Sequence, residues 1–341
     1  MKKLVIYSLC LMSIIFSGYQ VYSEENSNQL AGGYTIEGIP NDHQLDKEVS
    51  YFYLKENPGE HDQVKVKLTN DSEKEKTLQI EITNANTNSN GLIDYTGQLK
   101  DHVSLKKPLN SIAKATQKQV KVPAKSSVET VIDIQMPEQK LSGVIAGGIV
   151  VSEKKEDKNK KSKLTLENVY TYTLGLVLTN ESKVDPKHSD SVELENVGAV
   201  SVDGRKIVQA DILNKNPFIF PNATVKGSIL EKKSHEILKT QEKENVNIAP
   251  YSIFPFQFDW EKENLKEGQY IFEGLVESNG KSWKLEKEFT ITSEEAKKIN
   301  SESVFKVKIP EWLNYGACGL SVISILGTLY LLLRRKRQMV V

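Results

Sequence analysis

The sequence predicts an all-β protein with two immunoglobulin-like β-sandwich domains, followed by a short helix, a stalk and one C-terminal transmembrane helix. Three observations support this architecture. Many short segments alternate apolar and polar residues with a period of two, which is typical of half-buried strands. Turn dipeptides such as Asp203-Gly204 and Asn279-Gly280 separate some of these segments, and they favour tight hairpins. Two uninterrupted apolar runs occupy the ends of the 341-residue chain.

The first apolar run predicts a secretory signal peptide over residues 1–23. Lys2 and Lys3 form its basic start, Leu4–Phe16 is its apolar stretch, and Val21–Ser23 offers small residues near the cleavage position. An uncleaved N-terminal anchor is the alternative interpretation of this segment.

Residues 24–184 contain the strands of the predicted first sandwich. These strands are Tyr34–Ile39, Val49–Leu54, Val64–Leu68, Leu78–Ile82, Val128–Met136, Val144–Ser152 and Val169–Thr179. Asn70–Glu73 predicts a turn. The charge run Lys154–Lys163 is interpreted as the solvated tip of a hairpin, and a linker between domains is the alternative. Asp185-Pro186 then marks the predicted domain boundary.

Residues 185–292 contain the strands of the predicted second sandwich. These strands are Glu193–Val202, Arg205–Leu213, Thr224–Leu230, His235–Thr240, Tyr251–Trp260, Gln269–Ser278 and Lys281–Ile291. Thr292 and Glu295 have the spacing of a capping box, which predicts a short helix to about Ile299. We assign residues 293–312 to this helix and a stalk.

The second apolar run, Leu313–Leu333, predicts a transmembrane helix, because 21 uncharged residues would span about 31 Å of bilayer. Aromatic residues at its ends are the expected interface anchors, namely Trp312, Tyr315 and Tyr330. A basic cluster follows and is expected to stop transfer, namely Arg334, Arg335, Lys336 and Arg337. These features predict a single-pass cell-membrane protein with an extracellular, wall-facing ectodomain and a cytoplasmic tail over residues 334–341.

Charge and cysteine content exclude several classes of protein. The six basic residues at the two ends leave the middle with 39 basic and 45 acidic side chains, which argues against a nucleic-acid partner. Cys10 and Cys318 lie in the apolar runs, so the middle can hold neither a disulfide nor a cysteine nucleophile.

Motifs for catalysis, cofactors and metals are not evident in the sequence. No two histidines have the i, i+4 spacing of a helical zinc site, and no nucleophile elbow occurs. Gly143–Ile149 is glycine-rich but lacks the following Lys-Ser/Thr of a phosphate loop, so we interpret it as a buried strand with close backbone approach. We therefore predict a non-enzymatic protein with no cofactor and no metal.

One loop carries groups that suit recognition of a glycan. Its candidate binding residues are Asn84, Asn86, Asn88, Asn90 and Tyr95. Asparagine amides offer both donors and acceptors, and a tyrosine ring offers a face on which a sugar ring can pack. Solvated turn residues would have the same composition, and this alternative stays open.

Several segments together resemble the WxL-interacting proteins of Gram-positive bacteria. In the first half they are Tyr51–Gly59, Val64–Asn70, Ala85–Gly91 with Tyr95, Met136-Pro137 and Gly143–Ile149. In the second half they are Asn168–Tyr172, Leu213–Pro217, Ala249–Phe254, Gly268–Tyr270, Trp283 and Phe289–Ile291. The resemblance covers essentially the whole ectodomain and places the domain line near residue 160, whereas strand counting places it near 185.

The resemblance implies a surface protein whose first domain binds peptidoglycan and whose second domain binds a host extracellular-matrix protein. It also implies association with WxL-domain surface proteins. The expected function is therefore that of a binding and scaffold protein. The alternative is an assembly factor or chaperone that delivers WxL proteins to the cell wall.

Overall fold

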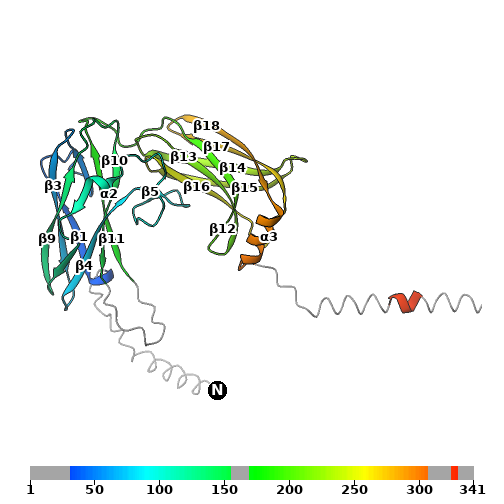
Figure 1. Cartoon of the computed structure of the whole chain (residues 1–341), viewed down its shortest axis with the longest axis horizontal. Helices are drawn as coiled ribbons and strands as arrows, with labels where there is room; N and C mark the ends of the chain where they lie inside the picture. Colours follow the sequence, from blue (N-terminus) through cyan, green and yellow to red (C-terminus); the bar gives the residue numbers. More distant parts are fainter. Residues whose placement is uncertain (1–30, 155–168, 306–323, 329–341) are drawn as a thin grey trace, which may run out of the picture. The chain divides into compact units, whose positions relative to one another are not determined.

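A computed structural model describes residues 31–154, 169–305 and 324–328 of the chain (Figure 1). The fold is all-β, as predicted, and divides into two compact units. The first unit contains the described residues up to Ala85 together with Tyr95–Lys100 and Lys106–Asp185. The second unit contains Asn86–Asp94, Asp101–Leu105 and the described residues from Pro186 onward.

The first unit is a sandwich of two sheets. Its elements are η1 (Ala31–Gly33), β1 (Tyr34–Ile39), β2 (Phe52–Lys55), β3 (His61–Asn70), β4 (Lys76–Asn84), α2 (Leu109–Ile112), β7 (Ala113–Ala115), β8 (Gln119–Val122), β9 (Ser126–Gln135), β10 (Ile145–Glu153) and β11 (Thr171–Thr179). One sheet has the order β1-β3-β9-β7, and the other has the order β2-β11-β10-β4-β8. Every pairing is antiparallel except β11 with β2.

Period-two patterning explains why these strands form and what they bury. In β3 the side chains of Val64, Val66 and Leu68 are at most 1% exposed, while the residues between them point outward. They pack in one apolar cluster with residues of the opposite sheet such as Leu78 and Ile149. The turn predicted at Asn70–Glu73 carries the chain from one sheet to the other.

The predicted hairpin around the charge run is confirmed in its strands. β10 and β11 pair antiparallel from Ile145 with Leu178 to Ser152 with Thr171. Gly147 lies in β10 where a Cβ atom would stand 2.1 Å from the carbonyl oxygen of Thr83, so the predicted close backbone approach is also confirmed. Most of the charge run itself lies outside the described residues.

The second unit is also a sandwich. Its elements are β5 (Asn86–Thr87), β6 (Ile93–Asp94), β12 (Glu193–Val202), β13 (Arg205–Asn214), β14 (Phe220–Glu231), β15 (Ile237–Ile248), β16 (Ser252–Asp259), β17 (Gly268–Ser278), β18 (Lys281–Ile291) and α3 (Ser293–Glu302). Its two large sheets have the orders β12-β13-β16 and β15-β14-β17-β18, and β5 pairs with β6. Phenylalanines such as Phe254, Phe256 and Phe272 fill the space between the sheets.

Both predicted tight hairpins are present. Asp203 and Gly204 join β12 to β13 with φ angles of 49° and 72°, and Asn279 and Gly280 join β17 to β18 with 49° and 73°. These are the left-handed values that a two-residue hairpin requires at both central positions, so the residue types set the turns.

The predicted capping box also forms. The Thr292 side chain accepts from the backbone N–H of Glu295, and the Glu295 carboxylate accepts from the backbone N–H of Thr292 at 2.9 Å. The α3 helix then buries Ala296 and Ile299 in the apolar cluster of the second unit. The helix is therefore part of this unit.

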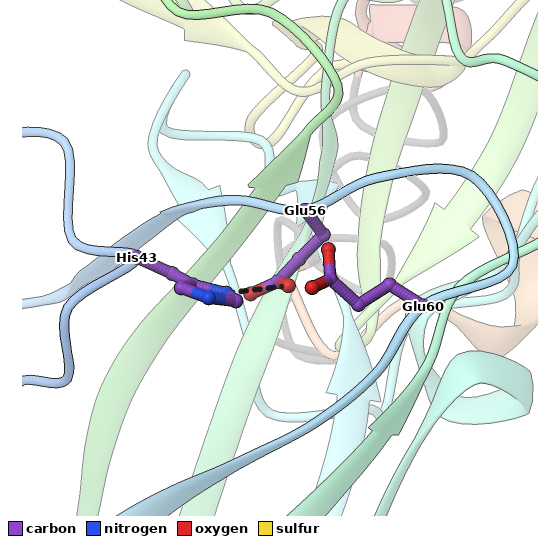
Figure 2. A group of neighbouring side chains, drawn as sticks. All are labelled: His43, Glu56 and Glu60. Carbon is purple, nitrogen blue, oxygen red and sulfur yellow. Dashed lines mark hydrogen bonds and ion pairs between the residues drawn. The ribbon is translucent and has the colours of Figure 1, made fainter.

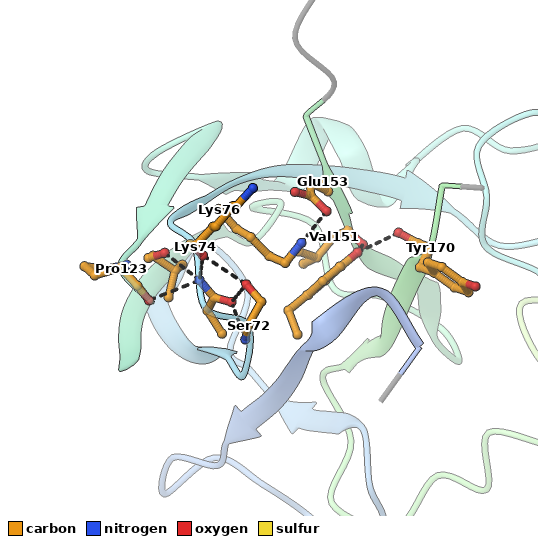
Figure 3. A network of polar contacts seen from close by, with 10 residues as sticks. Ser72, Lys74, Lys76, Pro123, Val151, Glu153 and Tyr170 are labelled. Atoms are coloured by element: carbon orange, nitrogen blue, oxygen red, sulfur yellow. Dashed lines mark hydrogen bonds and ion pairs between the residues drawn. The ribbon is translucent and has the colours of Figure 1, made fainter. Parts of the chain in front are cut away.

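A buried asparagine ends one long strand in each unit. In the first unit, Asn70 Nδ2 donates to the carbonyl oxygens of Lys74, Val122 and Pro123, and its Oδ1 accepts from Ser72 (Figure 3). Because both ends of the amide are engaged, Asn70 fixes the turn after β3 against the end of β8.

A second asparagine has the same role in the second unit. Asn214 Nδ2 donates to the carbonyl oxygens of Phe218, Ile248 and Ala249, and its Oδ1 accepts from Asn216. The turn after β13 is thereby fixed against the end of β15.

The predicted transmembrane helix requires correction. No helix among the described residues is long and apolar enough to cross a membrane. Within Leu313–Leu333 the structure describes residues 324–328, which are helical. This finding overturns the predicted membrane-spanning helix and the single-pass localisation that was built on it.

Other predictions for the ends of the chain lie outside the described residues. These are the signal peptide at 1–23, the remainder of the predicted span, the interface anchors Trp312, Tyr315 and Tyr330, and the basic residues Arg334, Arg335, Lys336 and Arg337.

Candidate functional site

The five predicted glycan-binding residues are distributed over the two units. Asn84 and Tyr95 belong to the first unit, whereas Asn86, Asn88 and Asn90 belong to the second. Asn84 is buried and its Oδ1 accepts from the backbone N–H of Asn110. Tyr95 is partly buried, and burial raises the pKa of its hydroxyl. Both residues are positioned by the first sandwich itself.

The three asparagines of the second unit differ in exposure. Asn86 is buried and its Nδ2 donates to Asp101 at 2.9 Å. Asn88 holds a turn, because its Oδ1 accepts from the backbone N–H groups of Asn90 and Leu92. The Asn90 side chain is exposed. Of these three residues, Asn90 is therefore the best placed to touch a ligand.

Asn90 lines an open groove of about 540 Å³ in the second unit. The lining residues are Ser89, Asn90, Val202, Asp203, Arg205, Ile207, Gln241, Lys243, Phe256, Gln257, Asp259, Val304 and Phe305. Three of them carry side-chain amides, two carry positive charges, and Phe305 offers an aromatic ring that is 43% exposed. A concave surface with a few polar groups beside an aromatic face is typical of a small-ligand site.

Hydrogen bonds and charge contacts fix the groove walls. Lys243 Nζ donates to the carbonyl oxygen of Ser89 at 2.7 Å. Burial lowers the pKa of this amine, because desolvation disfavours its charged form. Arg205 lies 3.4 Å from the Asp259 carboxylate, and its guanidinium stands 5.6 Å from the centre of the Phe305 ring. These contacts preorganise the cationic and aromatic parts of the groove.

A second group of polar residues gathers in the first unit, where the sequence predicts no site. His43 lies in the connection between β1 and β2, Glu56 directly follows β2, and Glu60 directly precedes β3 (Figure 2). One ligand-type atom from each of these three side chains lies within 4.8 Å of the others. His43 Nδ1 is 2.8 Å from Glu56 Oε2 and 3.4 Å from Asp62 Oδ2.

The electrostatics of this group follow from the burial of Glu56. Its side chain is 0% exposed, and desolvation raises the pKa of the carboxyl to about 7, although the hydrogen bond from His43 opposes the shift and Asp62 adds to it. The same hydrogen bond raises the pKa of His43. The imidazole and the carboxyl group are thus joined by one hydrogen bond.

The sequence does not predict this group, because the zinc pattern considered above requires two histidines at i, i+4 spacing and this group contains one histidine. The available signal was the Glu56–Glu60 pair around the Pro58-Gly59 turn. Folding of the β1–β2 connection is what brings His43 to these carboxylates, and no local pattern encodes that contact.

Three chaperone structures illustrate the likeness of this chain to solved structures. The YadV chaperone is 11% identical, and the match covers 76% of this chain and 100% of that chain with a TM-score of 0.26. The Pseudomonas aeruginosa CupB2 chaperone is 13% identical, with coverages of 66% and 91% and a TM-score of 0.27. The E. coli chaperone DraB is 12% identical, with coverages of 69% and 92% and a TM-score of 0.28. Likeness of this degree says nothing about function.

Comparison with curated protein sequences gave no match. Two family models, in contrast, match consecutive parts of the chain. The model described as the peptidoglycan binding domain of WxL Interacting Protein matches residues 34–153, and the model described as its host binding domain matches residues 161–301. Both describe binding domains, and neither describes an enzyme. Since the two matches follow in the order that the resemblance predicts, the chain belongs to the WxL-interacting protein family.

Proposed function

We propose that this chain is a cell-surface binding and scaffold protein that holds peptidoglycan and WxL-domain surface proteins and also binds a host extracellular-matrix protein. The observation that carries the proposal is the pair of family matches, a peptidoglycan binding domain followed by a host binding domain. A binding protein acts by contact surfaces, so its function depends on which groups those surfaces present.

The groove around Asn90 supplies suitable chemistry for a glycan strand. Ser89 and Asn90 belong to the stretch matched by the peptidoglycan binding domain, and most other lining residues belong to the stretch matched by the host binding domain. Asn90, Gln241 and Gln257 carry amides, and each amide combines two N–H donors with a carbonyl acceptor. The exposed face of Phe305 provides apolar area for the ring of a sugar. Arg205 and Lys243 add positive charge, and Asp203 and Asp259 add equal negative charge, so the lining can pair with both signs of charge on a ligand.

A sedimentation assay with purified sacculi tests this proposal. The full-length chain should co-sediment with sacculi, and Asn90→Ala and Phe305→Ala should each weaken retention, Phe305→Ala by roughly tenfold because it removes an apolar ring. Gln117→Ala and Tyr170→Ala are matched controls, since Gln117 is exposed and Tyr170 is 42% exposed, and neither lines the groove. A chain that stays in the supernatant would refute peptidoglycan binding, whereas equal retention of all variants would refute only the groove.

Partner lifetime separates a scaffold from a delivery factor. A scaffold should keep an immobilised WxL-domain protein bound through prolonged washing, whereas a delivery factor should release it when sacculi are added. Binding to extracellular-matrix proteins can be measured on the same surface. Rapid loss of the WxL-domain protein upon addition of sacculi would favour delivery over the scaffold role.

A further inference from the structure

The geometry around Glu56 points to a binding site for a divalent transition-metal ion, with His43, Glu56 and Glu60 as ligands and Asp62 as a fourth donor. Zn²⁺ is the ion that we expect to bind most tightly among those tested below. This site is independent of the proposed function, because none of these residues lines the groove around Asn90.

The donor atoms already have nearly the separations that a metal needs. In a tetrahedral zinc site with bonds of about 2.1 Å, neighbouring donor atoms lie about 3.4 Å apart. His43 Nδ1 and Asp62 Oδ2 are 3.4 Å apart, while His43 Nδ1 and Glu56 Oε2 are 2.8 Å apart with a proton between them. Replacing that proton with a metal ion requires this one pair to open by about 0.6 Å.

A buried oxygen without a donor lies in the cluster. Glu56 Oε2 contacts His43, but within residues 31–154, 169–305 and 324–328 no N–H or O–H group donates to Glu56 Oε1. Buried carboxylate oxygens are normally hydrogen-bonded or metal-bound, because an unpaired buried charge is costly. Figure 2 shows the Glu60 carboxylate directed toward the Glu56 carboxylate, so an acceptor and not a donor lies on that side of Glu56. A cation between them would satisfy both groups.

Surrounding hydrogen bonds hold the ligands in place. The backbone N–H of Glu56 donates to the Thr179 carbonyl, and the backbone N–H of Lys55 donates to the His43 carbonyl at 3.0 Å. Asn41 Nδ2 donates to Asp62 Oδ2 at 2.6 Å. Outer contacts of this type orient metal ligands and limit their rearrangement. The donors are therefore fixed on two strand ends and the loop beside them.

The donor set selects the class of ion. One imidazole nitrogen with carboxylate oxygens suits Zn²⁺ and Mn²⁺, whereas Ca²⁺ prefers six to eight oxygen ligands. For a given set of N and O donors, affinity rises from Mn²⁺ to Zn²⁺. We therefore expect the order Zn²⁺, then Mn²⁺, then Ca²⁺.

Calorimetric titration of the chelator-treated full-length chain tests the site. ZnCl₂ should bind with one-to-one stoichiometry and raise the thermal unfolding midpoint, MnCl₂ should bind more weakly, and CaCl₂ should have the least effect. Glu56→Gln keeps the shape of the side chain and removes its charge, and it should weaken Zn²⁺ binding at least tenfold. Glu60→Gln should weaken it in the same direction.

Controls keep the outcome decisive. His61→Gln removes an exposed histidine that lies 3.9 Å from Asp133, and it should leave the Zn²⁺ affinity unchanged. If Glu56→Gln does not fold, Glu60→Gln alone decides the result, because Glu60 is only partly buried. The proposal is refuted if the unsubstituted chain does not bind Zn²⁺. It is also refuted if Glu60→Gln and the unsubstituted chain bind Zn²⁺ with equal affinity, because the cluster would then not be the metal site.

Discussion

Each unit has a buried asparagine at the end of a long strand, but the side-chain oxygen of this asparagine has different partners in the two units. Asn70 and Asn214 are each 0% exposed, each ends a long strand, and each donates to three carbonyl oxygens. In the first unit, Asn70 Oδ1 accepts hydrogen bonds from the backbone N–H and the hydroxyl group of Ser72 within the same turn. In the second unit, Asn214 Oδ1 accepts from the backbone N–H and from Nδ2 of Asn216. The same Nδ2 also donates to the carbonyl oxygen of Ser191, which lies just before β12.

This difference shows how two sandwiches without an evident sequence repeat can share a physical solution. A chain that leaves one sheet for the other exposes unpaired carbonyl groups at the crossing, and a buried amide satisfies several of them at once. Both clamps link their turn to a distant strand end, and the second clamp also reaches the Ser191 carbonyl through Asn216. The second clamp should therefore matter more to its unit.

The largest expected effect comes from removing these two amides. Asn214→Ala leaves buried carbonyl groups of Ile248 and Ala249 unpaired and should destabilise the second unit by about 4 kcal/mol. Asn70→Ala should cost about 2.5 kcal/mol, because two of its three acceptors lie in partly buried bonds that water can replace. Hydrogen exchange measured by mass spectrometry would report each unit separately. Equal losses of protection in the two variants would contradict the comparison.

Substitution of a tightly packed glycine is expected to cause the next largest loss of stability. Gly147→Ala would place its Cβ 2.1 Å from a backbone oxygen and 2.5 Å from Leu109, and it should destabilise the first unit by about 3 kcal/mol. Gly198→Ala in β12 is the matched control in the second unit, since nothing lies within 4 Å of its added Cβ. That control should be neutral or slightly stabilising. Urea unfolding of both variants decides the point, and a stable Gly147→Ala protein would show that β10 can move away from β4.

Two buried tyrosines extend the comparison to smaller effects. Tyr34 Oη donates to the carbonyl oxygens of Val151 and Tyr170, and burial raises its pKa to about 12, so the hydroxyl stays a donor at ordinary pH (Figure 3). Tyr270 Oη donates to the carbonyl of Lys266 alone. Tyr34→Phe should cost about 1.5 kcal/mol and Tyr270→Phe about 0.7 kcal/mol. Thermal unfolding would measure both, and a reversed order would show that the second acceptor of Tyr34 contributes little.

The strands were predictable because their signal is local. β1, β12 and β18 begin and end at the residues that the period-two pattern indicates, and most other strands differ by a few residues at their ends. The short strands β7 and β8 were missed, because three or four residues carry too little alternation. The Leu313–Leu333 prediction is contradicted, because no helix among the described residues is long and apolar enough to cross a membrane.

Functional groups were harder to predict because their neighbours come from elsewhere in the chain. Asn70 stands in a turn-like sequence, and only folding brings it to Val122 and Pro123, which lie more than fifty residues away. The glycan-binding loop remains a prediction, and the structure buries Asn84 and Asn86 while it exposes Asn90. Residue type indicates which chemistry is available, while burial decides which of it can reach a ligand.

The smallest expected effect distinguishes a partly buried ion pair from an exposed one. Lys76 is 13% exposed and lies 2.6 Å from Glu153 in the first unit (Figure 3). Lys226 is 49% exposed and lies 3.1 Å from Glu242 in the second unit. Lys76→Met should destabilise the first unit by about 0.7 kcal/mol, while Lys226→Met should cause no measurable change, because water and salt screen exposed charges.

Salt dependence makes this last comparison specific to charge. Raising NaCl from low to high concentration should weaken whatever the Lys226 pair contributes and should affect the Lys76 pair less, since its lysine is largely shielded from solvent. Urea midpoints measured at both salt concentrations provide the result. If Lys76→Met and Lys226→Met shift the midpoint equally at low salt and not at all at high salt, then burial of Lys76 is energetically irrelevant. The difference between the units would then lie in their hydrogen-bonded turns and close backbone contacts, and their charges would contribute nothing to it.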